Sequence, residues 1–76
     1  MSKIPVVTVT GMIRLGQFLK LAGPVEDGAM ARELVQGGDV AVNGQVDTRR
    51  GRQLADGDLV QVDSPTGTWA ARVRTA

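Results

Sequence analysis

The sequence predicts a small α+β domain, because two helix-like segments lie among short β-branched segments that are joined by tight turns. The apolar residues of positions 12–22 recur at helical spacing, and a second such segment follows Asp27. Valine-rich stretches flank the turn-forming pair Asn43-Gly44, which is typical of a β-hairpin. At 76 residues the chain has room for one small core, so we expect residues 1–76 to form a single domain.

The N-terminal third is expected to contain one strand and one helix. Residues 4–10 are rich in β-branched side chains, which favours a strand, and Gly11 ends it. Residues 12–22 follow the pattern of an amphipathic helix that ends at Gly23-Pro24. Its apolar stripe consists of Leu15, Phe18, Leu19 and Ala22. The polar residues outside this stripe are Arg14, Gln17 and Lys20.

A second, shorter helix is expected to begin after Asp27, whose side chain is a favourable N-cap. Gly37-Gly38 ends it, since glycine readily adopts the backbone conformation that follows a helix. Its buried residues are predicted to be Ala31, Leu34 and Val35. Arg32 lies off that buried face and is therefore free to contact solvent or a partner.

Residues 40–46 predict a hairpin around Asn43-Gly44. A two-residue loop would place Val42 opposite Gln45. A three-residue loop, with Gly44 or Gln45 in the left-handed region, would place Val42 opposite Val46. We favour the three-residue loop, because it lets the valines at 40, 42 and 46 share one buried face.

The C-terminal third predicts a turn at residues 56–58, a strand at 59–62, a turn at 64–67 and a last strand at 68–74. In the last strand, Trp69, Ala71 and Val73 alternate with Ala70, Arg72 and Arg74. We expect the first set to face the core. The two arginines are expected on the exposed side of an edge strand, which they keep soluble, and extension of a basic surface is the alternative.

The composition argues against several classes of site. The chain has no cysteine and no histidine, so it lacks a thiolate, the commonest metal ligand and the commonest general base. We expect no metal, no cofactor, no small-molecule substrate and no catalysis, and we interpret Asp56 and Asp58 as turn residues. No apolar run reaches the roughly 18 residues of a spanning helix, and the first residues lack the apolar region of a secretory signal. These features favour a cytoplasmic protein without membrane contact.

The charges are unevenly distributed although the net charge is only +1. Residues 1–24 carry +3, residues 25–47 carry −4, residues 48–54 carry +3 and the remainder carry −1. If the fold brings both basic blocks beside Arg32, one face becomes basic while the acids collect elsewhere. A nearly neutral total is therefore compatible with an anionic partner.

The densest basic cluster is Arg49-Arg50-Gly51-Arg52, directly after the hairpin. Each arginine fork can donate two parallel hydrogen bonds to a phosphate, and Gly51 lets the backbone approach a ligand closely. Taken alone, arginines in a surface turn are most often only solvated. The cluster therefore indicates a nucleic-acid-binding site only in combination with the order of the other segments.

Taken in order, these segments resemble a known family. The likeness is carried by residues 13–20 (IRLGQFLK), 31–35 (ARELV), 38–44 (GDVAVNG) and 49–52 (RRGR). They are similar to the RNA-binding domain named after ribosomal small-subunit protein four, the S-four (S4) domain, in its stand-alone bacterial form. The resemblance covers roughly residues 12–62, with flanking strands at 4–10 and 68–74. It implies a two-helix unit packed on a small, mostly antiparallel sheet, the alpha-L RNA-binding motif.

The resemblance also implies that RNA lies along the helical face and the turn after the hairpin. The matching basic residues are Lys20, Arg32, Arg49, Arg50 and Arg52, with Arg14 beside them, and the matching polar residues are Asn43 and Gln17. From the residues alone, other interpretations stay open: Asn43 as a turn former, Lys20 as a surface residue of its helix, and Arg32 as a partner of Glu33 or Asp39. The sequence departs from the family pattern at Gly16-Gln17, Pro24, Asp27, Met30 and Gln53. A lysine often stands at the last of these positions, so its absence lowers the expected affinity.

We therefore predict a monomeric, non-catalytic protein that binds structured RNA, in particular ribosomal RNA, a ribosomal subunit or an assembly intermediate. One Trp, one Phe and no Tyr leave little to stack on unpaired bases, which favours recognition of shape and phosphate. The alternative is a small adaptor whose basic turn docks on an acidic protein, and salt dependence separates the two. We also expect that replacing Arg49, Arg50 and Arg52 together with alanine weakens RNA binding by several kcal/mol, since each charged hydrogen bond contributes roughly 1.5–3 kcal/mol, and leaves the fold intact.

Overall fold

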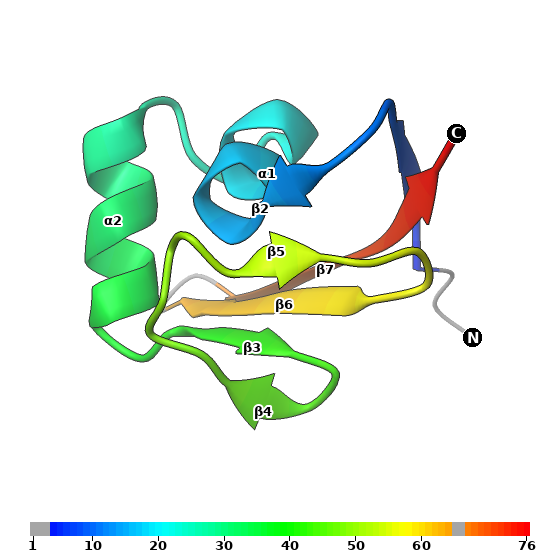
Figure 1. Ribbon diagram of the computed structural model, residues 1–76. Coiled ribbons are helices and arrows are strands. Elements are labelled where there is room, and N and C mark those ends of the chain that lie inside the picture. Colours follow the sequence, from blue (N-terminus) through cyan, green and yellow to red (C-terminus); the bar gives the residue numbers. More distant parts are fainter. Residues whose placement is uncertain (1–3, 65–66) are drawn as a thin grey trace.

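The computed structural model describes residues 4–64 and 67–76, which form two helices, one five-stranded sheet and one two-stranded sheet (Figure 1). The elements are β1 (Val6–Val9), β2 (Ile13–Arg14), α1 (Leu15–Ala22), α2 (Gly28–Gln36), β3 (Val40–Val42), β4 (Gln45–Val46), β5 (Gln53–Leu54), β6 (Leu59–Ser64) and β7 (Gly67–Thr75). The predicted α+β class, with two helices on a mostly antiparallel sheet, is confirmed. The central residues of the predicted turn at 64–67 lie outside the described residues.

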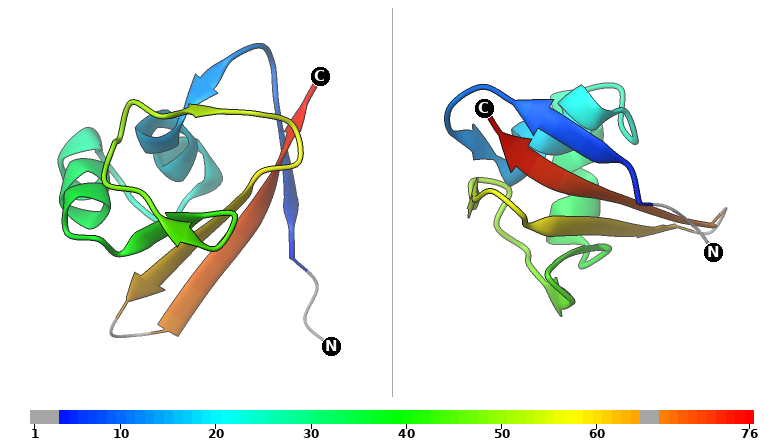
Figure 2. Two further views of the ribbon diagram at one scale, coloured as in Figure 1. Left: turned by 60° about the horizontal axis from the view of Figure 1, so that its bottom comes forward. Right: turned by 90° about the vertical axis from the view of Figure 1, so that its right-hand side faces the viewer.

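The larger sheet has the strand order β1-β7-β6-β3-β4. Its pairs are antiparallel except for β1 and β7, which run parallel and lie side by side in both views of Figure 2. The predicted alternation along β7 is confirmed, since Ala71 and Val73 are buried while Arg72 and Arg74 are exposed. The prediction of an edge strand was wrong. Local sequence does not reveal that β1 returns to pair with β7 and covers its outer edge.

One hydrophobic core joins the helices to one face of the larger sheet. From the helices it takes Leu15, Phe18, Leu19, Ala31 and Val35, and from the sheet Val9, Val40, Val42, Val60, Val62, Ala71 and Val73. Trp69 is half-buried, with its ring centroid 6.4 Å from that of Phe18 and a tilt of 58° between the rings. This arrangement belongs to the favourable range for aromatic pairs, so the prediction of Trp69 as a core residue is supported. Ala22 and Leu34 are only partly buried at the rim of this core.

Helix α1 begins three residues later than predicted. Ile13 and Arg14 are extended, because they pair with Leu54 and Gln53 of β5. The N–H of Arg14 then donates to the side-chain oxygen of Gln17 at 3.1 Å, which closes the helix start. Strand β5 was not predicted, since two residues give no periodicity to recognise. The C-terminal end is as predicted, with Gly23 in the left-handed region at φ 107°.

Helix α2 has the predicted ends. The Asp27 carboxylate accepts a hydrogen bond from the N–H of Met30 at 2.9 Å, as an N-cap does. After Gly37, Gly38 takes a positive φ of 82°, and the chain enters β3. The two helices contact each other and are joined by only five residues, 23–27, so their relative position is closely constrained.

The hairpin between β3 and β4 corrects a prediction. Its loop has two residues, with Val42 opposite Gln45 and Ala41 opposite Val46. Both loop residues have positive φ, 53° for Asn43 and 84° for Gly44, which is the geometry of a type I′ turn. Val46 is therefore 64% exposed and does not share the buried face of Val40 and Val42. The turn geometry outweighs the burial of one more valine.

We expect Gly44→Ala to destabilise the protein by roughly 1–2 kcal/mol, the cost of placing an L-residue in the left-handed region. Nothing lies within 4 Å of the position of a Cβ at Gly44, so the effect would come from the backbone alone. Gly28→Ala is the matched control, because its surroundings are equally open and its φ is ordinary. Urea unfolding should give a lower midpoint for the first variant and an unchanged or higher one for the second. Equal midpoints would contradict the assigned turn.

Candidate nucleic-acid interface

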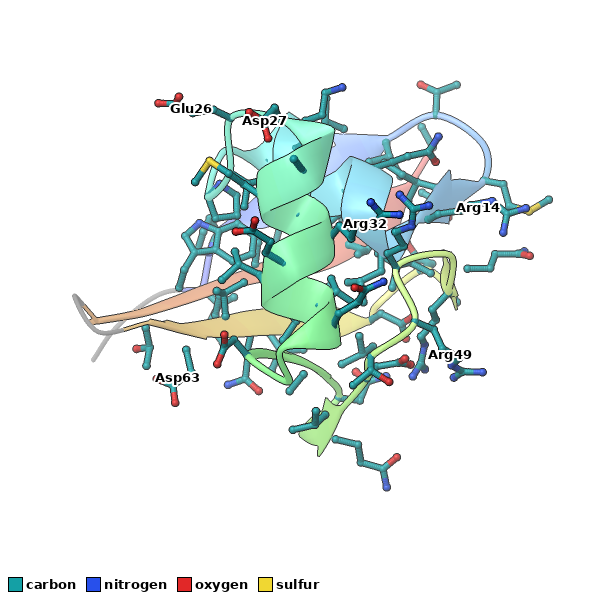
Figure 3. All side chains as sticks on the ribbon, turned by 90° about the vertical axis from the view of Figure 1, so that its left-hand side faces the viewer. Arg14, Glu26, Asp27, Arg32, Arg49 and Asp63 are labelled. Atoms are coloured by element: carbon teal, nitrogen blue, oxygen red, sulfur yellow. The ribbon has the colours of Figure 1, made fainter. Side chains whose placement is uncertain are left out.

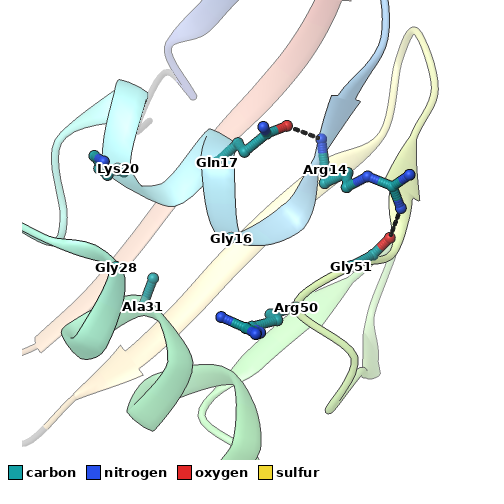
Figure 4. Close-up of a pocket in the computed structure, with 8 residues that line it drawn as sticks. All are labelled: Arg14, Gly16, Gln17, Lys20, Gly28, Ala31, Arg50 and Gly51. Atoms are coloured by element: carbon teal, nitrogen blue, oxygen red, sulfur yellow. Dashed lines mark hydrogen bonds between the residues drawn. The ribbon is translucent and has the colours of Figure 1, made fainter.

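A hollow of about 350 Å³ lies where α1, α2 and the arginine turn, residues 49–52, meet (Figure 4). Its lining residues are Arg14, Gly16, Gln17, Lys20, Gly28, Ala31, Arg50 and Gly51. Half of these residues are glycine or alanine, so a ligand can approach the backbone closely. The other half are four of the predicted site residues, which lie up to 36 positions apart in the sequence.

The arginine turn is hydrogen-bonded to the N-terminal end of α1 by its backbone. The N–H of Leu15 donates to the carbonyl oxygen of Arg52 at 2.8 Å, and that of Gly16 donates to Arg50 at 2.9 Å. The Arg14 guanidinium donates to the carbonyl oxygen of Gly51 at 2.9 Å. The first N–H groups of a helix have no partner within the helix, and here the turn supplies the acceptors. The position of Arg50 relative to α1 is set by these contacts.

Three cations near this hollow have no protein partner in the part of the chain that the structure describes. The exposed side chains of Lys20, Arg32 and Arg50 make no hydrogen bond or ion pair there. In Figure 4 the Arg50 guanidinium points from the turn toward α2, while Lys20 projects from α1. Arg32 does not line the hollow but lies one helical turn beyond Gly28, which does. Their donors are therefore available to an anionic ligand.

The charges are segregated over the molecule. Figure 3 shows Arg14, Arg32 and Arg49 toward one side of the view, and Glu26, Asp27 and Asp63 toward the other. Of the acidic block, Glu26 and Asp27 thus lie away from Arg14 and Arg49 in this view, whereas Asp47 pairs with the arginine turn. The fold creates a local basic surface from a chain with a net charge of +1.

Asp47 holds two of the three arginines of the turn. Its carboxylate accepts bonds from Arg49 Nε at 3.1 Å and Arg49 Nη2 at 3.0 Å, and from Arg52 Nη1 at 2.8 Å. It also accepts the backbone N–H of Arg49 at 2.9 Å. The Asp47 side chain is only 5% exposed, whereas Arg49 is 74% exposed and Arg52 29%. Arg50 is thus the only arginine of the turn whose guanidinium lacks a partner among the described residues.

The hydrogen bonds between Asp47 and the two arginines shift the pKa values of Asp47 and Arg49. Hydrogen bonds from Arg49 and then Arg52 hold the pKa of Asp47 well below its ordinary value of 3.8, against the opposing effect of burial. The bond to Asp47 in turn raises the pKa of Arg49. Asp47 is therefore ionised at neutral pH and pairs with both arginines as a carboxylate.

We expect the ion pairs of Asp47 with Arg49 and Arg52 to make the free energy of unfolding depend on pH in the acidic range. The pKa of Asp47 is lower in the folded than in the unfolded chain, so its contribution is complete well above pH 3.8 and is lost as the pH falls below that value. Urea unfolding between pH 6 and pH 2 should show a decline that is shallower in Asp47→Asn than in wild type. Parallel declines in the two proteins would contradict the assigned pair.

The structure gives Asn43 a role inside the protein. Its side-chain N–H donates to Asp58 at 2.9 Å, and its side-chain oxygen accepts the N–H of Leu59 at 2.9 Å. Asp58 also accepts the N–H of Ala55, and Asp56 accepts that of Thr75. The asparagine ties the hairpin turn to the next turn, and both carboxylates stabilise backbone groups, as turn residues do.

Sequence reasoning missed the most buried charged residue and the small residues of the hollow. Asp47 stands two positions before Arg49, and this Asp-x-Arg spacing was the available signal for an internal ion pair. Gly16, Gly28 and Ala31 gave no signal, because small residues on helices have no chemistry to recognise. In the described ranges, no cluster of three or more acidic, histidine or cysteine side chains could hold a metal ion. No helix in those ranges is long and apolar enough to cross a membrane.

Comparison with known proteins decides the family. Residues 6–68 match the S4 domain, which is most of the chain. The chain belongs to the S4 domain family. This confirms the resemblance found in the sequence, and it extends the matched region on both sides of the expected 12–62 to include β1 and all of β6. The hollow and the arginine turn both lie within the S4 domain.

A curated relative is similar over nearly the same extent. The S4 domain protein described above is 46% identical over 59 residues to the probable ribosome maturation protein RlbA of Bacillus subtilis (strain 168). The aligned region covers 78% of this chain and 83% of the relative. The two proteins are therefore similar over most of their lengths.

Proposed function

We propose that this protein binds structured RNA, and that its target is ribosomal RNA or a ribosome assembly intermediate. The observation that carries the proposal is the meeting of Arg14, Gln17, Lys20 and Arg50 around one hollow, with two cations that have no protein partner in the described chain. Membership of the S4 domain family and likeness to a ribosome maturation protein support the choice of target. Arg32 extends the same surface along α2.

The chemistry of the hollow suits an RNA backbone. Lys20 of α1 and Arg50 of the arginine turn both line it and can each contact a phosphate, while Arg14 keeps its remaining donors for a third. Gln17 uses its side-chain oxygen at the helix start, so its N–H groups are left for a 2′-hydroxyl. Trp69 packs against Phe18 and is not presented as a stacking platform. Recognition of shape and phosphate therefore fits better than recognition of unpaired bases.

The proposed activity is binding without catalysis, cofactor or metal. Asp47, Asp56 and Asp58 accept hydrogen bonds from the protein itself and are not placed as a general acid and base. We leave Asn43 out of the proposed interface, since its side chain is engaged with Asp58 and Leu59. A monomer acting in the cytoplasm, where ribosomes are assembled, is part of the same proposal.

Crosslinking followed by sequencing of the bound RNA in cells tests this function. Wild type should enrich defined helices of ribosomal RNA, whereas the double variant Lys20→Ala, Arg50→Ala should not. The control is Arg72→Ala, Arg74→Ala, which removes the same charge from β7, on the face of the sheet away from the core. Equal enrichment by both variants would reject the hollow as the site. No RNA above background for wild type would favour the adaptor that docks on an acidic protein.

A further inference from the structure

Asp47 is an acidic residue that lies beneath the arginine turn, and its side chain is nearly completely buried. It follows β4 directly, and its own N–H donates to the carbonyl oxygen of Val40 in β3 at 3.0 Å. All the hydrogen bonds of its carboxylate go to the arginine turn. The acid lowers the positive charge of the turn, and it pairs with two of the three arginines there.

We propose that Asp47 is a positioning residue that gives the interface its preference for structured RNA over other polyanions. It converts Arg49 and Arg52 from mobile cations into fixed supports, so that Arg50 is held at one place relative to α1. The inference rests on the proposed function, because it concerns how the same surface selects its RNA.

The support runs through an unbroken series of hydrogen bonds. Strand β3 holds Asp47, and Asp47 holds Arg49 and Arg52 by their side chains. The N–H of Arg52 donates to the carbonyl oxygen of Arg49 at 3.1 Å, which closes the turn. The carbonyl oxygens of Arg50 and Arg52 then accept bonds from the first two N–H groups of α1, and that of Gly51 accepts one from the Arg14 side chain. Removal of Asp47 would therefore loosen the distance between Arg50 and the cations of α1, although it removes none of them.

Asp47 weakens the attraction of the arginine turn for phosphate, and in our proposal it increases the selectivity for folded RNA. Asp47 reduces the charge of the turn from +3, for three arginines, to +2. Attraction between cations and phosphates acts on every nucleic acid and carries no information on base sequence or on a particular fold, so it contributes affinity with little selectivity. A rigid set of donors instead matches phosphates only where the RNA holds them at the corresponding spacing. A fixed turn thus favours a folded RNA over a flexible strand.

The test compares Asp47→Asn with Glu26→Gln, which removes one negative charge from the exposed loop between α1 and α2, outside the arginine turn. Binding of each protein is measured to refolded total ribosomal RNA and to single-stranded poly(U). We expect Asp47→Asn to bind ribosomal RNA more weakly and poly(U) more tightly, so that the preference falls about tenfold, as expected for the loss of one ordered charged contact. Glu26→Gln should keep the wild-type preference.

Other outcomes overturn the inference in distinguishable ways. A purely structural role for Asp47 would weaken binding to both RNAs, and a purely electrostatic role would strengthen binding to both, with the preference unchanged in each case. If wild type does not prefer ribosomal RNA over poly(U), the proposed function fails together with the inference. Circular dichroism shows whether Asp47→Asn is folded. If it is not, Arg52→Lys carries the test, because it keeps every charge and alters only the geometry of the support.

Discussion

The double variant Lys20→Ala, Arg50→Ala is expected to lose at least about a hundredfold in affinity for its RNA and to remain folded. Each charged hydrogen bond contributes roughly 1.5–3 kcal/mol, so the loss of two amounts to about 3–6 kcal/mol. Neither side chain has a partner among the described residues, so truncation leaves no protein group unsatisfied. Titration of refolded ribosomal RNA with each protein measures the change.

Salt dependence provides a second measurement on the same variant. Each phosphate contact contributes roughly 0.7–0.9 to the slope of log affinity against log salt, so the loss of two contacts should reduce the slope by about 1.4–1.8. The variant Arg72→Ala, Arg74→Ala removes equal charge from the other face of the sheet and should keep the slope nearly unchanged. If both variants lose the same affinity, general charge rather than this hollow determines binding.

The second large effect is expected on stability. Arg49→Ala, Arg52→Ala should destabilise the protein by about 3 kcal/mol, because it leaves the buried Asp47 carboxylate without either cation. We take the lower end of the usual range, since the Arg49 side of the pair is exposed to solvent. Such a loss is a large part of the 5–15 kcal/mol that is typical of a domain. Urea unfolding at neutral pH measures it.

A third substitution tests whether the unpaired Asp47 carboxylate causes this destabilisation. Adding Asp47→Asn to that double variant removes the unpaired buried charge, so stability should partly recover although one more native group is lost. A further decrease in stability would mean that the arginines act through packing of their side chains and not through Asp47.

The destabilisation expected for Arg49→Ala, Arg52→Ala also argues against the triple alanine variant that the sequence alone suggests. Alanine at Arg49, Arg50 and Arg52 together is expected, from the sequence, to weaken RNA binding strongly in an intact fold. Two of those residues neutralise a buried acid, so the triple variant would confuse lost binding with lost folding. Variants at Lys20 and Arg50 test RNA binding without leaving a buried charge unpaired, so they separate lost binding from lost folding.

Several features followed from the sequence because neighbouring residues decide them. Asp27 caps α2, Gly23 ends α1, and the spacing of Leu15, Phe18 and Leu19 identifies the buried face of α1. Each of these depends on contacts within one helical turn, so a short window of sequence contains the whole cause. The family resemblance was accurate for the same reason, since its motifs are local segments in a fixed order.

The errors arose where a distant segment decides the local structure. Ile13 and Arg14 continue the helical pattern of α1, yet they are extended because β5, about 40 positions later, pairs with them. Val46 continues the valine pattern, yet the type I′ turn places it on the exposed face. Strand β7 lies inside the sheet because β1 pairs with its free edge.

The sequence by itself determined the fold class, the family and the set of residues from which a basic surface could be made. Only the tertiary structure decided how those residues are used. It brings Arg14, Lys20 and Arg50 to one hollow, engages Arg49 and Arg52 with Asp47, and assigns Asn43 to the link between two turns. The physical reason is that a charged side chain can pair with solvent, with a ligand or with another residue of its own chain. Which of these it does depends on neighbours that folding brings from elsewhere in the sequence.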